Sequence, residues 1–138
     1  MKLFFDEDVG RGVPEALRAI DACDTVSYVR LAFRSQIQAG RFPDGVKDED
    51  WIPFAGRGGW LVVSCNVRIL DAEAQRNLWI TEGVGGVFLT SGHEKKLDVL
   101  RLMLRKLDWL EAIDREVARP FAYLLPMRGS ARRDLRVP

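Results

Sequence analysis

Residues 2–9 read KLFFDEDV, an apolar run that changes at Asp6 into three consecutive acids with two glycines close behind. The apolar half predicts a buried β-strand, and the glycines predict a loop directly after the acids. In an open α/β sheet, ligands bind beyond the carboxyl ends of the strands. We therefore expect Asp6 and Asp8 to face a binding site, while Glu7 alternates to the opposite side.

Strand-like and helical segments alternate along the rest of the chain, which is typical of an α/β fold with a mainly parallel sheet. We predict a three-layer α/β/α domain whose central sheet has about five strands, the last of them at an edge. The predicted strands cover residues 2–5, 25–29, 60–63, 86–90 and 121–125. The predicted helices cover residues 13–20, 48–58, 71–81 and 94–119, the last as one bent helix or two.

Two features of these helices can be compared directly with a structure. Asp71 is expected to cap the helix that runs to Thr81. Apolar residues at spacings of three and four predict one buried face on the last helical segment, with an interface as the alternative role. They are Leu97, Leu100, Leu104, Leu107, Leu110 and Ile113.

The length of 138 residues suits a single domain. We interpret residues 1–127 as this domain and residues 128–138 as a basic C-terminal tail, which holds four arginines and one acid, Asp134. The formal net charge is only +1, so the positive charge is local to this segment. A cluster of arginines can bind phosphates, whereas the alternative is a frayed, solvated terminus.

The predicted location is cytoplasmic, without membrane contact. The chain starts directly with the predicted strand and lacks the regions of a secretory signal. No apolar run approaches the roughly 18 residues that a membrane-spanning helix needs. Cys23 and Cys65 are expected to be reduced and packed, since their spacing suggests neither zinc nor a disulfide framework. His93, the only histidine, is expected in a surface loop.

Polar residues occur at three equivalent places in this layout, after the first strand, at the start of a helix and after the third strand. They are Asp6 and Asp8, then Asp48, Glu49 and Asp50, and then Asn66. Clustered carboxylates repel one another unless a cation neutralises them, and oxygen ligands suit Mg²⁺ or Mn²⁺. We expect the metal ligands to be Asp6, Asp8, Asp48 and Asp50. The alternative for the second group is a helix cap and a solvated first turn.

These residues resemble the PIN-like nuclease superfamily, and most closely its small VapC-type toxin relatives. The similar segments are FFDED at 4–8, DEDWI at 48–52, WLVVSCNVRI at 60–69 and VFLT at 87–90. The resemblance implies a parallel sheet between helices, an acidic metal cleft and Mg²⁺- or Mn²⁺-dependent RNA cleavage. It also implies a cognate antitoxin protein as partner, and relatives often form homodimers.

The resemblance assigns roles to individual positions. Asp6 matches the acid that ends the first strand, and Asp48 matches the acid at the head of the helix that carries Trp51. Asn66 falls where relatives carry an aspartate, and Arg68 matches a basic position in the same turn. The implied catalytic residues are thus Asp6, Asp48 and Asn66. An amide at position 66 lacks the negative charge, so Mg²⁺ should bind more weakly.

Two other hypotheses stay open beside a metal-dependent ribonuclease of toxin type. The amide at position 66 and the basic tail also fit a catalytically degenerate PIN-like module that binds RNA or a partner protein. The acids at 6–8 also satisfy the Asp-x-Asp pattern of haloacid-dehalogenase-like phosphatases, with Asp6 as nucleophile, although the chain is short for that fold. For a PIN-like protein, we expect Arg68, Arg132 and Arg133 to contact RNA.

Overall fold

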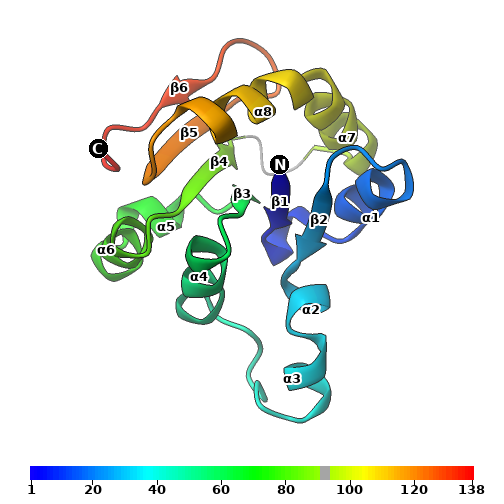
Figure 1. The fold of residues 1–138 in the computed structure, drawn as a ribbon, viewed down its shortest axis with the longest axis vertical. Helices are drawn as coiled ribbons and strands as arrows, with labels where there is room; N and C mark the ends of the chain where they lie inside the picture. Colours follow the sequence, from blue (N-terminus) through cyan, green and yellow to red (C-terminus); the bar gives the residue numbers. More distant parts are fainter. Residues whose placement is uncertain (91–93) are drawn as a thin grey trace.

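The computed structural model describes residues 1–90 and 94–138 as a sheet of six strands between two layers of helices (Figure 1). His93 lies outside the described residues. The sheet order is β2-β1-β3-β4-β5-β6, and all neighbours are parallel except β5 and β6. The strands are β1 (Lys2–Phe5), β2 (Thr25–Tyr28), β3 (Leu61–Ser64), β4 (Gly85–Leu89), β5 (Phe121–Leu125) and β6 (Arg132–Arg133).

Helices connect the parallel strands. They are η1, a 3₁₀ turn (Glu7–Val9), α1 (Gly12–Ala19), α2 (Val29–Ala32), α3 (Arg34–Gln38), α4 (Asp48–Arg57), α5 (Arg68–Asp71), α6 (Glu73–Thr81), α7 (Lys96–Arg105) and α8 (Leu107–Glu116). The short helices α2 and α3 project from the body of the molecule (Figure 1). None of the described helices is long and apolar enough to span a membrane.

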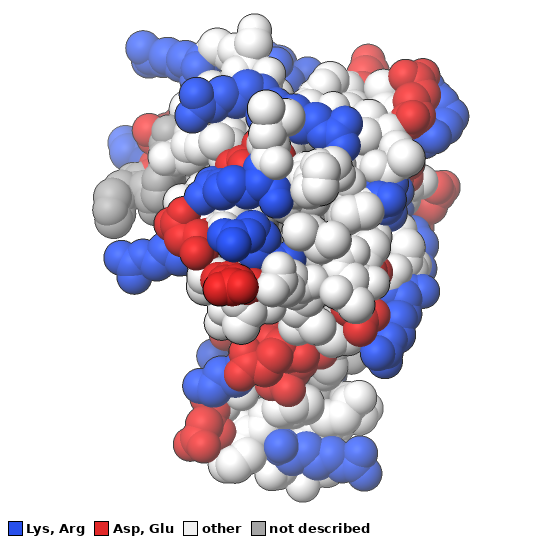
Figure 2. Space-filling model, turned by 90° about the vertical axis from the view of Figure 1, so that its left-hand side faces the viewer, with Lys and Arg blue, Asp and Glu red and all other residues white. Residues whose placement is uncertain are grey.

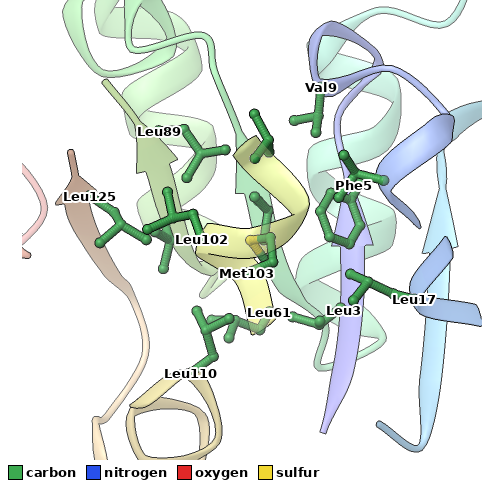
Figure 3. Packing of buried hydrophobic residues seen from close by; sticks show 14 of the residues in the cluster. Leu3, Phe5, Val9, Leu17, Leu61, Leu89, Leu102, Met103, Leu110 and Leu125 are labelled. Carbon is green, nitrogen blue, oxygen red and sulfur yellow. The ribbon is translucent and has the colours of Figure 1, made fainter. Parts of the chain in front are cut away.

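The apolar run of β1 is buried on both faces of the sheet. Leu3 and Phe5 join the core cluster shared with α1, α7 and α8, whereas Phe4 joins the cluster shared with α4, α5 and α6. All three side chains are fully buried. Figure 3 shows the first cluster, with Met103 of α7 packed over the sheet near Leu61. Successive apolar residues that are buried on both faces are the pattern that a central parallel strand requires, and β1 has it from Leu3 to Phe5.

The order of the strands creates a switch point between β1 and β3. The chain leaves β1 in one direction to form β2 and then returns to form β3 on the other side of β1. The connections from β1 and β3 therefore depart to opposite sides, and ligands of open α/β sheets bind at such switch points, beyond the carboxyl ends of the strands. Asp6 follows β1 directly, and Asn66 lies just beyond β3.

The crossover from β4 to β5 has the opposite hand to the other parallel crossovers. The connections from β2 to β3 and from β3 to β4 place their helices, α4 and α6, on one face of the sheet. The connection from β4 to β5 runs in the same direction across the sheet, but its helices, α7 and α8, lie on the other face with α1. Such crossovers are right-handed in about 98% of cases. The exception places α7 beside α1 (Figure 1), and Lys96 of α7 reaches Val9, which follows β1.

The predicted α/β fold is confirmed, and two details differ from the prediction. The sheet has six strands, and β5 is internal because β6 pairs with it. Asp71 ends α5 instead of capping α6, since Ala72 is extended and separates the two helices. Of the two predicted alternatives for the last helical segment, the structure has two helices, because the chain breaks at Lys106.

The predicted apolar face of the last helical segment is wrong for two leucines. Leu97 is 55% exposed and Leu104 is 42% exposed. The buried residues of α7 are instead Val99, Leu102 and Met103. The break between α7 and α8 resets the helical periodicity, so a single stripe drawn through both helices does not follow the buried side of the first.

The C-terminal segment is folded against the domain. β6 pairs with β5, and the N–H of Asp134 donates to the carbonyl of Ala122 at 2.8 Å. Val137 is fully buried in the core cluster on the α4 face. The face that includes the C-terminus carries Lys and Arg side chains interspersed with acids (Figure 2). The alternative of a frayed terminus is therefore wrong.

Candidate functional site

Asp6 is held in a fixed position at the carboxyl end of β1. Its N–H donates to the carbonyl of Val63 at 3.0 Å, which continues the pairing of β1 with β3. One carboxylate oxygen accepts the N–H of Glu7 at 2.7 Å, and the other accepts the hydroxyl of Ser64 at 2.9 Å. Asp6 is only 7% exposed, so these two donors, from β3 and η1, define its orientation.

The environment of Asp6 disfavours its charged form. Burial is the main cause, and the negative charges of Asp8 and Asp48 add to it, so that the pKa rises from 3.8 to about 7. The hydrogen bonds from Ser64 and Glu7 act in the opposite direction but do not compensate. Among the described residues, Asp6 has acidic neighbours and forms no ion pair, and a buried carboxylate in such surroundings is typical of a functional site.

Asp8 and Asp48 complete the acidic cluster from two other elements. Asp8, in η1, accepts the N–H of Cys65 at 3.1 Å, just beyond β3. Asp48, the first residue of α4, accepts the indole N–H of Trp51 at 3.2 Å, and Trp51 is itself buried. Burial raises the pKa of both carboxyl groups, and the charge of Asp48 raises that of Asp8 further. The structure thus brings Asp6, Asp8 and Asp48 to one end of the sheet.

The donor set fits a hard divalent cation without forming a complete cage. Within residues 1–90 and 94–138, no group of three or more His, Cys, Asp or Glu side chains is close enough together to hold a metal ion. Mg²⁺ usually keeps several waters and needs only one or two carboxylates from the protein. The negative charges of the neighbouring acids raise the pKa of Asp6 and of Asp8. A divalent cation would relieve this repulsion, and carboxylate oxygens are the ligands that it prefers.

Asn66 lies beside this cluster, but its side chain stabilises a turn. Its carbonyl oxygen accepts the N–H of Arg68 at 3.3 Å, and its own N–H donates to Ser64 at 2.9 Å. Ser64 therefore links Asn66 to Asp6 through one fully buried hydroxyl. Arg68, exposed at the start of α5, is the one predicted RNA-binding arginine that follows β3.

Three other acids near these positions have different roles. Asp50 accepts the N–H of Lys47 at 2.8 Å, so its carboxylate caps α4. Glu7 pairs with Arg30 at 3.2 Å. Glu49 is exposed and raises the pKa of Asp48 through its charge. The structure thus supports the cap interpretation for Asp50, whose role as a metal ligand stays a prediction.

The predicted RNA-binding residues Arg132 and Arg133 lie at the far side of the sheet. Both are exposed on β6, which is four strands from β1. At about 4.8 Å per strand, that separation is roughly 19 Å. Their role in binding RNA stays a prediction, and the structure brings Arg68 much closer to the acidic cluster.

Two residues of the site were missed by sequence reasoning. Ser64 orients Asp6, and a hydroxyl at the end of a buried strand would have been the signal. Lys96, at the start of α7, donates its ammonium group to the carbonyl of Val9 at 2.8 Å. Burial and the neighbouring acids raise the pKa of the Cys65 thiol to about 11, and the positive charge of Lys96 opposes this rise. No local pattern indicates a contact between residues 87 positions apart.

A cavity opens beside Asp6 on the side of β2. It has a volume of about 300 Å³, within the usual range for ligand sites. Its lining residues are Asp6, Glu7, Gly10, Arg11, Tyr28, Val29 and Arg30. The buried carboxylate is thus reachable from a cavity that also presents guanidinium groups.

The fold and the site define an α/β protein with an acidic cluster at the switch point of its parallel sheet. A family model described as "PIN like domain" matches residues 1–91, the part of the chain that contains β1 to β4 and the whole acidic cluster. The chain belongs to this family of PIN-like domains. No curated protein and no solved structure matches it significantly.

Proposed function

We propose that this protein is a Mg²⁺- or Mn²⁺-dependent ribonuclease of the PIN-like type. The observation that carries the proposal is the buried Asp6 carboxylate, whose pKa is about 7 and whose acidic neighbours are Asp8 and Asp48. Membership of the PIN-like domain family supports the same chemistry. The family assignment also disfavours a haloacid-dehalogenase-like phosphatase.

In this proposal, one or two of the carboxylates of Asp6, Asp8 and Asp48 would bind the ion directly, and the remaining acid would bind its waters. A bound divalent ion supplies an activated water and stabilises charge on the phosphodiester. Ser64 and the N–H of Glu7 keep the Asp6 carboxylate in one orientation, so its oxygens do not have to reorganise when the substrate binds. Trp51 does the same for Asp48.

The test is metal binding followed by RNA cleavage on the same samples. Calorimetry with Mn²⁺ should show binding to the wild type and at least about tenfold weaker binding to Asp6→Asn. The matched control is Asp44→Asn, which removes an exposed carboxylate from a loop and should leave binding unchanged. Metal-dependent cleavage of RNA should be lost in Asp6→Asn only. Cleavage that persists in a chelator, or that survives Asp6→Asn, would refute the proposal.

A second function, RNA or protein binding without cleavage, is favoured by one observation. The Asn66 carbonyl oxygen already accepts a backbone N–H, so this side chain is engaged in the turn before α5. In an inactive wild type, Asn66→Asp distinguishes the two functions. A gain of metal-dependent cleavage indicates a nuclease with a weakened site, and no gain indicates a binding module.

We further propose that this ribonuclease is the toxin component of a toxin–antitoxin pair, which requires a cognate antitoxin protein. The direct test is co-expression with the protein encoded by an adjacent gene, followed by co-purification and measurement of RNA cleavage. A stable complex with reduced cleavage would support a toxin–antitoxin pair. Sedimentation of the isolated chain tests the homodimer.

A further inference from the structure

A second cavity continues from the one beside Asp6. It has a volume of about 350 Å³ and shares three lining residues with the first, namely Arg11, Tyr28 and Arg30. Its other lining residues are Glu15, Arg18, Leu31 and Arg34. The two cavities together form one groove, which we call the arginine groove, that starts at the buried carboxylate and runs outward past the end of β2.

The arginine groove is rich in positive charge. Four exposed arginines line it, against the two glutamates Glu7 and Glu15 and the buried Asp6. They are Arg11, Arg18, Arg30 and Arg34.

Two of these arginines are already paired with the glutamates. Arg30 pairs with Glu7 at 3.2 Å, and Arg18 pairs with Glu15 at 3.9 Å. Among the described residues, no ion pair involves Arg11 or Arg34. Exposed ion pairs are weak, so an incoming anion can replace the glutamate partners.

The groove also contains an aromatic side chain that is held in place. Tyr28, the last residue of β2, is half-buried, and its hydroxyl donates to Glu15. Guanidinium groups bind phosphates with two parallel hydrogen bonds, and aromatic rings provide a surface on which bases stack. Several arginines together with an aromatic ring in one groove are the elements that bind single-stranded nucleic acid.

We propose that a single strand of RNA lies in the arginine groove. Its backbone phosphates contact Arg11 and Arg34, one base stacks on Tyr28, and the strand leads a phosphodiester to Asp6. The choice of RNA as ligand rests on the proposed nuclease function, whereas the groove itself is defined by its lining residues. The basic residues on β6 have no part in this path, because they lie about four strands away.

The test measures binding without cleavage. Fluorescence anisotropy of a labelled 12-nucleotide RNA, in buffer with a chelator, is compared between the wild type and the double variant Arg11→Gln/Arg34→Gln. We expect about tenfold weaker binding. The slope of log K against log salt concentration should become shallower by about 1.4, which is roughly 0.7 for each lost phosphate contact. Tyr28→Ala should weaken binding, and Tyr28→Phe, which keeps the ring, should not.

The competing RNA path over β6 is tested with Arg132→Gln/Arg133→Gln, which removes the same charge; if RNA follows the arginine groove, this variant changes affinity less than about twofold. Thermal melting of each variant confirms that it is folded. Equal losses of RNA affinity in both double variants would indicate general electrostatic attraction and would overturn the proposal that RNA lies in the groove. A loss in the β6 variant alone would also overturn it.

The outcome also separates this inference from the nuclease proposal. RNA binding that depends on the arginine groove, without any metal-dependent cleavage, supports the groove and contradicts the nuclease. Cleavage that depends on Asp6 but is insensitive to Arg11→Gln/Arg34→Gln supports the nuclease and overturns the groove.

Discussion

The acidic cluster and the C-terminal segment are both groups of charged residues, but the structure treats them in opposite ways. At the end of β1, Asp6 is buried beside two other acids, and its pKa rises to about 7. In the C-terminal segment, Asp134 is equally buried, but Arg136 donates three side-chain hydrogen bonds to it, and its pKa falls. Arg136 also contacts Asp71 of α5.

The difference shows how to separate functional charge from structural charge. A buried carboxylate with a guanidinium partner is neutralised within the fold and contributes to stability. A buried carboxylate without such a partner costs stability in the ionised form, and its charge remains available to a ligand. The two carboxylates should therefore respond to pH with opposite signs.

The largest effect is expected for Asp6→Asn in the absence of divalent ions. Native Asp6 keeps its proton up to about pH 7, whereas the unfolded chain releases it near 3.8, so the free energy of unfolding falls as the pH rises between these values. At pH 8 the variant should be more stable than the wild type by about 2–4 kcal/mol, and at pH 4 the two should be nearly equal. Urea denaturation in a chelator measures this, with Asp44→Asn as the control. Equal pH dependence in the wild type and Asp6→Asn would contradict the assignment.

The second effect, on Asp134→Asn, should have the opposite sign. The lowered pKa of Asp134 means that its carboxylate stabilises the fold above 3.8, and that this stability is lost as the pH falls through the lowered value. At pH 7 the variant should lose about 1–2 kcal/mol, a range reduced because Arg136 is 39% exposed. Denaturation at pH 7 and at pH 3 tests this. A loss of equal size at both pH values would show that the ion pair is not its cause.

A third prediction adds a carboxylate to the unpaired cluster. Asn66→Asp should tighten Mn²⁺ binding about tenfold, or about 1.4 kcal/mol, because it increases the negative charge near Asp6 and Asp8. Calorimetry on this variant and on the wild type gives the ratio. Unchanged affinity would mean that position 66 does not face the ion.

The smallest effect is expected for Arg132→Gln/Arg133→Gln. Both side chains are exposed on β6, and neither takes part in the pairing of Arg136 with Asp134. Replacing them should change the free energy of unfolding by less than about 0.5 kcal/mol. Thermal melting at neutral pH tests this. A larger loss of stability would show that Arg132 and Arg133 stabilise the fold together with Arg136.

Much of the fold could be predicted because its signals are local. The apolar run at 2–5 indicates a buried strand by composition alone, and Pro14 and Gly83 mark where helices begin or end. β2 ends one residue earlier than predicted, and β3 and β4 are each shifted by one residue at both ends. β6 escaped prediction because a two-residue strand has no periodicity, and α2 and α3 did because four or five residues cannot display a helical repeat.

The candidate site was predicted in part for the same reason. Acids that end an apolar strand can be seen in the sequence, and so can an acid that begins a helix. What could not be seen is which acids have partners. The sequence offered a cap as one role for Asp50, and the structure selected it, whereas the turn role of Asn66 depends on local geometry and the pairing of Asp71 with Arg136 spans 65 positions.

The sequence by itself thus determined the alternation of strands and helices, the family of the domain and the position of Asp6 at a strand end. Only the tertiary structure decided that Asp6, Asp8 and Asp48 share one site, that the tail is folded, and that an arginine groove opens beside the acids. The physical reason is that secondary structure follows local periodicity, whereas burial and charge pairing depend on residues that are distant in sequence. Asp6 and Ser64, 58 positions apart, make the contact that orients the proposed catalytic carboxylate.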